Sequence, residues 1–160
     1  MFAPTVVRMI DPITTRIGPL PSDAVVQAYR GFQKRLASGE VASPPDPDDA
    51  EEAGHDAFED AIWDGPARTA WHLVLELLRT APDDELGFYA AGPLEDLVRL
   101  HGAEIIGEIE AEARRDSRFR WALGCIWLSH GELPADVLAR VVRASGDEIK
   151  PLPPLDSLEH

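Results

Sequence analysis

Two stretches of the chain are apolar on almost every side of a helix, and this feature constrains the fold most strongly. The first begins at Pro66 and runs to about Thr80, with a polar stripe limited to Arg68, His72, Glu76 and Arg79. The second runs over residues 118–129. A helix with so narrow a polar face has to be covered by its neighbours. Both stretches are therefore predicted to be central helices.

Proline and glycine divide the rest of the chain into short helices. We expect helices over residues 23–37, 48–63, 83–91, 93–101, 103–115 and 134–145, with Gly39, Gly92, Gly102 and Gly146 at helix ends. Acidic residues in the first turns and arginines in the last turns suit the helix dipole. With no convincing pair of strands, the predicted fold class is all-α, a compact array of about seven or eight short antiparallel helices.

A helical repeat is a second interpretation of the same pattern. His72, His101 and His130 lie 29 residues apart, and the dipeptide His-Gly recurs at 101–102 and 130–131. Equal spacing of this kind is typical of repeat architectures. The sequences between the histidines align poorly, so both interpretations stay open.

Composition predicts how the chain is organised. Residues 1–21 carry four prolines and are expected to form an arm across the domain. Residues 1–64 are predicted to pack as an extension on a core unit spanning 65–146, followed by a proline-rich tail over 147–157. Residues 158–160 resemble the start of a vector-encoded tag.

The charge of the chain is strongly acidic and unevenly placed. There are 15 Lys and Arg against 29 Asp and Glu, a formal net charge of −14. Residues 40–64 contain ten acidic residues and no Lys or Arg. Such a balance argues against a nucleic-acid binder or a protein held on anionic lipid. It favours another protein as partner, in particular one with a basic surface. The candidate interaction residues are Asp48, Asp49, Glu51, Glu52 and Asp56.

Several other classes of protein are disfavoured by what the chain contains. A single cysteine, Cys125, provides neither a disulfide framework nor a cysteine-rich zinc site, and we expect its thiol to be buried. No apolar run has the ~18 residues of a membrane span, and no signal peptide is evident, so a cytoplasmic location is expected. One Glu-x-x-His spacing, Glu52 to His55, lacks the second copy that a di-iron site needs. No metal and no cofactor are therefore predicted.

A candidate polar site is centred on two helix ends. Glu95 and Asp96 follow a predicted helix start, and His101 precedes a predicted helix stop. With Arg118 and Arg120 these residues could line a shared polar cleft. Dipole complementation accounts for acids at helix starts and for histidine at helix ends without any chemistry. No catalytic residue is therefore assigned.

Basic and aromatic residues alternate around residue 118. Arg114, Arg115, Arg118 and Arg120 surround Phe119 and Trp121. Such interleaving could contact nucleic acid. The acidic surroundings and the core-like spacing of the two aromatic residues favour a solvated turn between helices instead. These arginines could also pair with Glu95, Asp96 or the acidic segment inside the fold.

One block of the sequence carries a resemblance. The pattern comprises Ala70-Trp71, Pro82-Asp83-Asp84, the run Gly-Pro-Leu-Glu-Asp-Leu over residues 92–97, His101-Gly102 and an Arg- and Trp-rich stretch over 114–127. It resembles an uncharacterised bacterial family of helical domains of unknown function, over about residues 66–145. The resemblance implies no activity. It implies that these residues form one unit.

Two functions from different classes follow from the sequence. The first is a small, non-enzymatic protein-interaction module, of which an immunity or antitoxin protein is one concrete version. The second is a small-ligand binder or an enzyme with a polar cleft near His101, Glu95 and Arg120. We expect the first, because no nucleophile or cofactor motif accompanies the polar residues.

Overall fold

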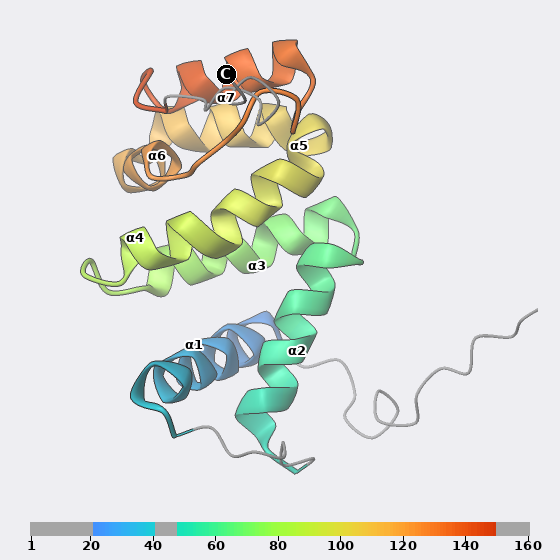
Figure 1. Cartoon of the computed structure of the whole chain (residues 1–160), viewed down its shortest axis with the longest axis vertical. Helices are drawn as coiled ribbons and strands as arrows, with labels where there is room; N and C mark the ends of the chain where they lie inside the picture. The colour runs from blue at the N-terminus through green and yellow to red at the C-terminus, as the bar shows by residue number, and fades with distance from the viewer. Residues whose placement is uncertain (1–20, 41–47, 150–160) are drawn as a thin grey trace, which may run out of the picture.

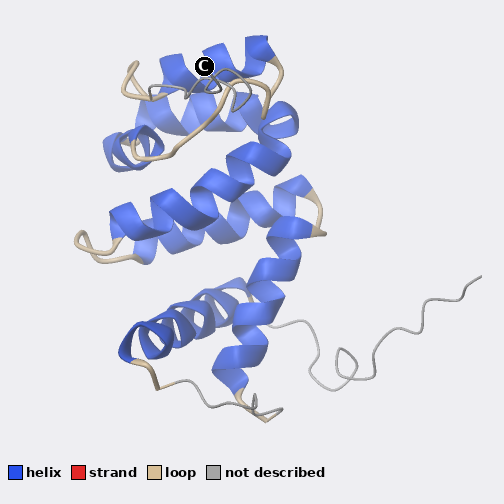
Figure 2. Ribbon diagram, viewed as in Figure 1, coloured by secondary structure: helices blue, strands red, loops and turns tan. Residues whose placement is uncertain are grey.

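The computed structural model describes residues 21–40 and 48–149, and within them the chain is helical without strands (Figures 1 and 2). The elements are α1 (Ser22–Ser38), α2 (Ala50–Trp63), α3 (Ala67–Thr80), α4 (Leu86–Tyr89), the π-helix η1 (Ala90–Leu94), α5 (Glu95–Arg115), α6 (Ser117–Gly124) and α7 (Ala135–Ala144). The predicted all-α class is confirmed. The proline-rich arm up to residue 20, the loop over 41–47 and the tail from residue 150 lie outside the described residues.

The helices stack along the long axis of the molecule (Figure 1). α1 and α2 lie at one end and α7 at the other, with α3 and α5 between them. Helix α3 contacts α1 and α2 as well as α5, and eight of its fourteen residues are buried. One continuous apolar core includes side chains of α1 through α7. The prediction that residues 66–80 form a central helix is therefore confirmed.

Local signals at the helix ends act as the sequence indicates. Gly39 and Gly146 have positive φ angles of 74° and 77°, which glycine adopts without steric cost. Asp49 and Asp116 cap α2 and α6, each accepting hydrogen bonds from two backbone amides of the first turn. The three histidines spaced at 29 residues occupy unlike positions, since His72 and His101 lie inside helices and His130 in a turn. This placement disfavours a repeat.

Two predicted helix breaks are wrong. Pro93 starts no new helix but lies inside η1, a π-turn that joins α4 to α5 without a loop. A π-turn widens the helix locally, which accommodates a residue that has no amide hydrogen to donate. Gly102 does not end a helix either, because α5 continues through it to Arg115. Gly102 is buried there under Leu133, whose Cδ2 would lie 3.3 Å from an added Cβ.

The second predicted central helix is shorter than its apolar run. Helix α6 ends at Gly124, and the residues that follow form an irregular segment. Phe119 is buried on α6, whereas Trp121 is 55% exposed and Trp127 beyond the helix is 64% exposed. The expectation that Trp121 belongs to the core is wrong, because the described helices leave more than half of this residue exposed.

Helices α1 and α2 approach each other closely at Gly54. A Cβ placed on this glycine would lie 2.2 Å from the Cβ of Ala28, so the Ala28 side chain of α1 packs directly against the backbone of α2. Glycine in a helix interior lowers helix propensity. Here it is retained because any side chain would force the two helices apart.

Replacing Gly54 by alanine is expected to destabilise the protein by about 1–3 kcal/mol, because the overlap involves two Cβ atoms that cannot rotate away. Gly107→Ala is the matched control, since Gly107 lies inside α5 with no atom within 4 Å of its Cβ position. That control is expected to gain about 0.5–1 kcal/mol from helix propensity. Urea unfolding measures the free energy of unfolding of both variants. Changes of the same sign in the two variants would contradict the close contact of α1 with α2 at Gly54.

A buried carboxylate ties α5 to α3. Glu112 of α5 is 2% exposed at its side chain, and it accepts a 2.9 Å hydrogen bond from Nη2 of Arg79 on α3. Arg115, one turn further along α5, forms an ion pair with its other oxygen. A buried carboxylate without a cation is costly, so the two arginines permit Glu112 to stay inside.

Removing both cations with Arg79→Gln and Arg115→Gln is expected to destabilise the protein by roughly 3–5 kcal/mol, because a buried negative charge is left unpaired. Denaturant unfolding of the double variant measures this. Arg114→Gln, the same chemical change at the neighbouring exposed residue, is expected to stay within about 0.5 kcal/mol of the parent protein. Equal midpoints for the double variant and this control would refute the role of Glu112.

Candidate functional site

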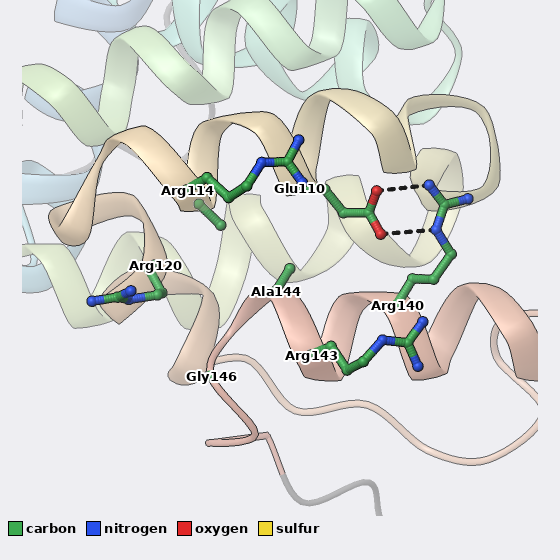
Figure 3. A pocket seen from close by; sticks show the side chains of 8 residues that line it. Glu110, Arg114, Arg120, Arg140, Arg143, Ala144 and Gly146 are labelled. Carbon is green, nitrogen blue, oxygen red and sulfur yellow. Dashed lines mark hydrogen bonds and ion pairs between the residues drawn. The ribbon is translucent and has the colours of Figure 1, made fainter.

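Four arginines from three helices surround one hollow at the α7 end of the molecule (Figure 3). The hollow has a volume of about 330 Å³. Its lining consists of Glu110, Ala113 and Arg114 of α5, Arg120 of α6, and Arg140, Arg143, Ala144 and Gly146 at or just beyond the C-terminal half of α7. We call this hollow the arginine pocket.

Helical spacing places these side chains together. Glu110 and Arg114 are four residues apart on α5, and Arg140 and Arg143 are three residues apart on α7, so each pair shares a face of its helix. The two helices pack against each other, which brings the two faces together. Arg120, exposed on α6, lines the pocket from a third helix, and its guanidinium points away from the Glu110–Arg140 pair (Figure 3).

Only one of the four arginines has a carboxylate partner within the described residues. Glu110 accepts two hydrogen bonds from Arg140, at 2.9 Å from Nε and 2.7 Å from Nη2. This bidentate pair fixes the Arg140 guanidinium at the edge of the pocket. Arg114, Arg120 and Arg143 form no ion pair with any carboxylate in residues 21–40 and 48–149. The pocket therefore has a local excess of positive charge in an acidic protein.

The positive field acts on Glu110. The hydrogen bonds from Arg140 lower the pKa of the Glu110 carboxyl. Desolvation opposes this shift, and the charges of Arg140, Arg114 and Arg143 add to it. The same contact raises the pKa of Arg140. Glu110 is therefore ionised at neutral pH and offsets one of the four positive charges.

A second hollow adjoins the arginine pocket and shares Arg120 and Gly146 with it. This hollow has a volume of about 510 Å³, and Trp121 and Cys125 lie in its wall. Cys125 is half-buried just after α6, so the expectation of a fully buried thiol is wrong. Burial raises the pKa of this thiol, which keeps it protonated at neutral pH.

Glu95 and Asp96 of the predicted polar site share one cation. Arg99 donates to Glu95 at 2.6 Å and to Asp96 at 2.9 Å. It also donates to Glu132 at 3.1 Å. The second oxygen of Glu95 accepts a 2.8 Å bond from the backbone amide of Trp127. This cluster fastens the segment after α6 to the start of α5. The expectation that Glu95 and Asp96 pair with the arginines of residues 114–120 is therefore wrong.

The other members of the predicted polar site have different partners. His101 makes a 2.7 Å hydrogen bond through Nε2 with the backbone carbonyl of Ile62, which fixes α5 to the last turn of α2. Arg118 donates to the carbonyl oxygens of Leu78 and Ala81 and pairs with Asp83, so it closes the loop after α3. Of the five predicted residues, only Arg120 lines the arginine pocket.

Sequence reasoning missed the pairing of α5 with α7 at this site. In the sequence, Arg114 and Arg120 belong to a basic stretch, whereas the spacing of Arg140 and Arg143 predicts only an outward face of the last helix. Their spacing shows that each pair shares a helix face. It does not show which two faces meet, because that depends on the path of the chain through α6.

The acidic segment partly pairs within the protein. Asp49 and Glu51 both accept from Arg35 of α1, at 2.6 and 3.2 Å. These contacts lower the pKa of Asp49. Asp56 lies 3.3 Å from His55, whereas Asp48 is exposed and Glu52 is half-buried. The basic first helix is thus one electrostatic partner of these acids, and their contact with another protein stays a prediction.

Two further findings bear on the classes of site. No group of three or more His, Cys, Asp and Glu side chains that could hold a metal ion occurs among the residues that the structure describes. Over the same residues, none of the helices combines the length and apolarity required to cross a membrane.

The fold and the pocket define a class, a small all-helical protein with an arginine-lined hollow formed by its last three helices. The chain belongs to DUF6869, a family of unknown function whose model matches residues 43–149. The match takes in α2 to α7, and it begins in the acidic segment rather than at residue 66. The expected membership of an uncharacterised domain family is confirmed. Comparison with curated proteins and with solved structures gives no match.

The variant Arg140→Gln is expected to raise the Glu110 pKa toward its ordinary value, because the bidentate hydrogen bonds are lost while Arg114 and Arg143 remain. A carboxylate with a lowered folded pKa stabilises the protein above its unfolded pKa, and this contribution disappears as pH falls through the folded pKa. The melting temperature of the variant should therefore be lower than that of the parent protein at neutral pH and equal to it in strong acid. Carboxyl NMR titration and melting curves measure both effects.

Arg68→Gln serves as the control, because Arg68 pairs with Glu108 and does not line the arginine pocket. An unchanged Glu110 titration in Arg140→Gln would show that Arg140 does not set the state of this carboxylate.

Proposed function

We propose that this protein is a non-enzymatic protein-interaction module that binds its partner through an exposed aromatic surface. The surface, named here the aromatic edge, consists of Phe88 on α4, Trp121 on α6 and Trp127 after α6. Their side chains are 61%, 55% and 64% exposed. This exposure is the observation that carries the proposal, since large aromatic side chains at the surface are typical of protein-binding sites.

The elements that carry these aromatic residues touch one another. A Cβ on Gly87, the residue before Phe88, would lie 3.7 Å from the ring of Trp121. Helix α6 also contacts η1, which follows α4 directly. The Glu95–Trp127 hydrogen bond fixes the backbone of Trp127 to the start of α5. The aromatic edge is thus supported by a fixed backbone, which lowers the entropic cost of binding.

The charge of the protein supports a partner with a basic surface. The acidic residues of α2 and its N-terminus remain in large excess over Arg35, and they can steer a basic protein toward this chain. An immunity or antitoxin protein fits this description as a small acidic helical binder. We propose a cytoplasmic location for it on the same sequence grounds.

The enzyme or ligand-binding alternative near His101, Glu95 and Arg120 has less support. It requires these side chains to converge on one cleft. Instead, His101 bonds to α2, Glu95 bonds to Arg99 and the amide of Trp127, and Arg120 lines the arginine pocket.

Trp121→Ala is expected to weaken partner binding by about 30-fold or more, the loss typical of a tryptophan hot spot. The partner is identified by comparing proteins captured from an extract of the source organism by the parent chain and by the variant. Its affinity for each is then measured with both components purified.

Trp63→Ala is the matched control, since Trp63 is 53% exposed on α2 and lies outside the aromatic edge. The two variants remove the same side chain at similar exposure, so equal stability is expected. A partner whose affinity is unchanged by Trp121→Ala, or falls equally with Trp63→Ala, would refute the aromatic edge as the binding surface.

A further inference from the structure

The arginine pocket holds more positive charge than helix capping requires. Arginines in the last turn of α5 and α7 complement the negative ends of those helices, which accounts for single residues such as Arg114 and Arg143. It does not account for four guanidinium groups around one hollow, with Arg120 contributed by a helix that ends elsewhere. Like charges repel at close range, so this arrangement is favourable when an anion lies between them.

The shape of the pocket indicates which anion fits. A carboxylate is planar and can be satisfied by a single guanidinium, as Glu110 is by Arg140. Arg114, Arg120 and Arg143 instead line the pocket from α5, α6 and α7, and none of them has a carboxylate partner among the described residues. Donors that arrive from several directions suit a tetrahedral group with several charged oxygens.

The charge and the size of the pocket point to a small ligand. Four arginines and one ionised glutamate leave an excess of positive charge in the pocket, and a dianionic phosphate would largely neutralise it. The volume of about 330 Å³ lies at the lower end of the range for small-molecule sites. A nucleic acid would also meet the acidic remainder of a chain whose net charge is −14, and this repulsion disfavours a long polyanion.

From this geometry we infer that the arginine pocket is a binding site for a phosphoryl group, supplied by inorganic phosphate or by a small phosphorylated metabolite. Arg114, Arg120 and Arg143 donate to the phosphoryl oxygens. Arg140, held by Glu110, shapes the wall of the pocket. The arginine pocket shares no residue with the aromatic edge, although Trp121 lies in the wall of the adjoining hollow. Phosphate titration and partner binding are separate measurements, so the failure of one proposal can be told from the failure of the other.

The test measures binding of inorganic phosphate to the full chain by calorimetry, at constant ionic strength set with sodium chloride. The parent protein should bind phosphate saturably. The double variant Arg114→Gln and Arg143→Gln should bind it at least about tenfold more weakly, since it loses two charged donors. Both arginines are exposed and without a described ion pair, so the variant should fold, which circular dichroism verifies. Arg120→Gln provides an independent single variant with the same expected direction.

Arg68→Gln on α3 removes one positive charge, as Arg120→Gln does, and is therefore the charge-matched control for that single variant. It should leave phosphate binding unchanged. Glucose 6-phosphate, a small phosphorylated metabolite, is titrated in parallel. Whichever of the two compounds binds more tightly identifies the source of the phosphoryl group. Three results would overturn the inference. They are absence of saturable phosphate binding, equal weakening by Arg68→Gln, and tighter binding of succinate or of a single-stranded oligonucleotide than of phosphate.

Discussion

The need to cover α3 on nearly every side determines the rest of this structure. Its apolar side chains are too many for one neighbour, so α1 and α2 pack against it from one direction and α5 from another. Helix α7 then packs on α5. The ends of α5, α6 and α7 consequently meet far from α1, and this end of the molecule contains the arginine pocket (Figure 1).

Buried and half-buried polar groups fix this stack rather than the apolar contacts alone. Apolar burial is non-directional, whereas a charged hydrogen bond requires one geometry. Glu112 binds α5 to α3 through Arg79, and His101 binds α5 to the end of α2. Arg118 secures the loop after α3. These contacts use most of the polar residues that look functional in the sequence. In the arginine pocket, by contrast, three arginines have no carboxylate partner among residues 21–40 and 48–149.

The predictions that held rest on interactions between near neighbours in sequence. The helix ends at Gly39 and Gly146 depend on a few adjacent residues and were predicted, and capping by Asp49 and Asp116 is equally local. The breaks expected at Pro93 and Gly102 failed because distant contacts outweighed local preference. Leu133 packs on Gly102, and no local signal reveals that contact. For the candidate site, Arg120 could be anticipated from its basic stretch, whereas its partners on α7 could not.

The sequence by itself determined the all-α class, the central place of α3 and the concentration of acid before and within α2, because these follow from periodicity and composition. Only the tertiary structure decided which helix faces meet. That choice exposes Trp121, commits Glu95 and Asp96 to Arg99, and brings Arg114 beside Arg143. The physical reason is that the periodicity of a helix indicates which of its faces is apolar. Which other helix covers that face depends on packing among residues far apart in the chain.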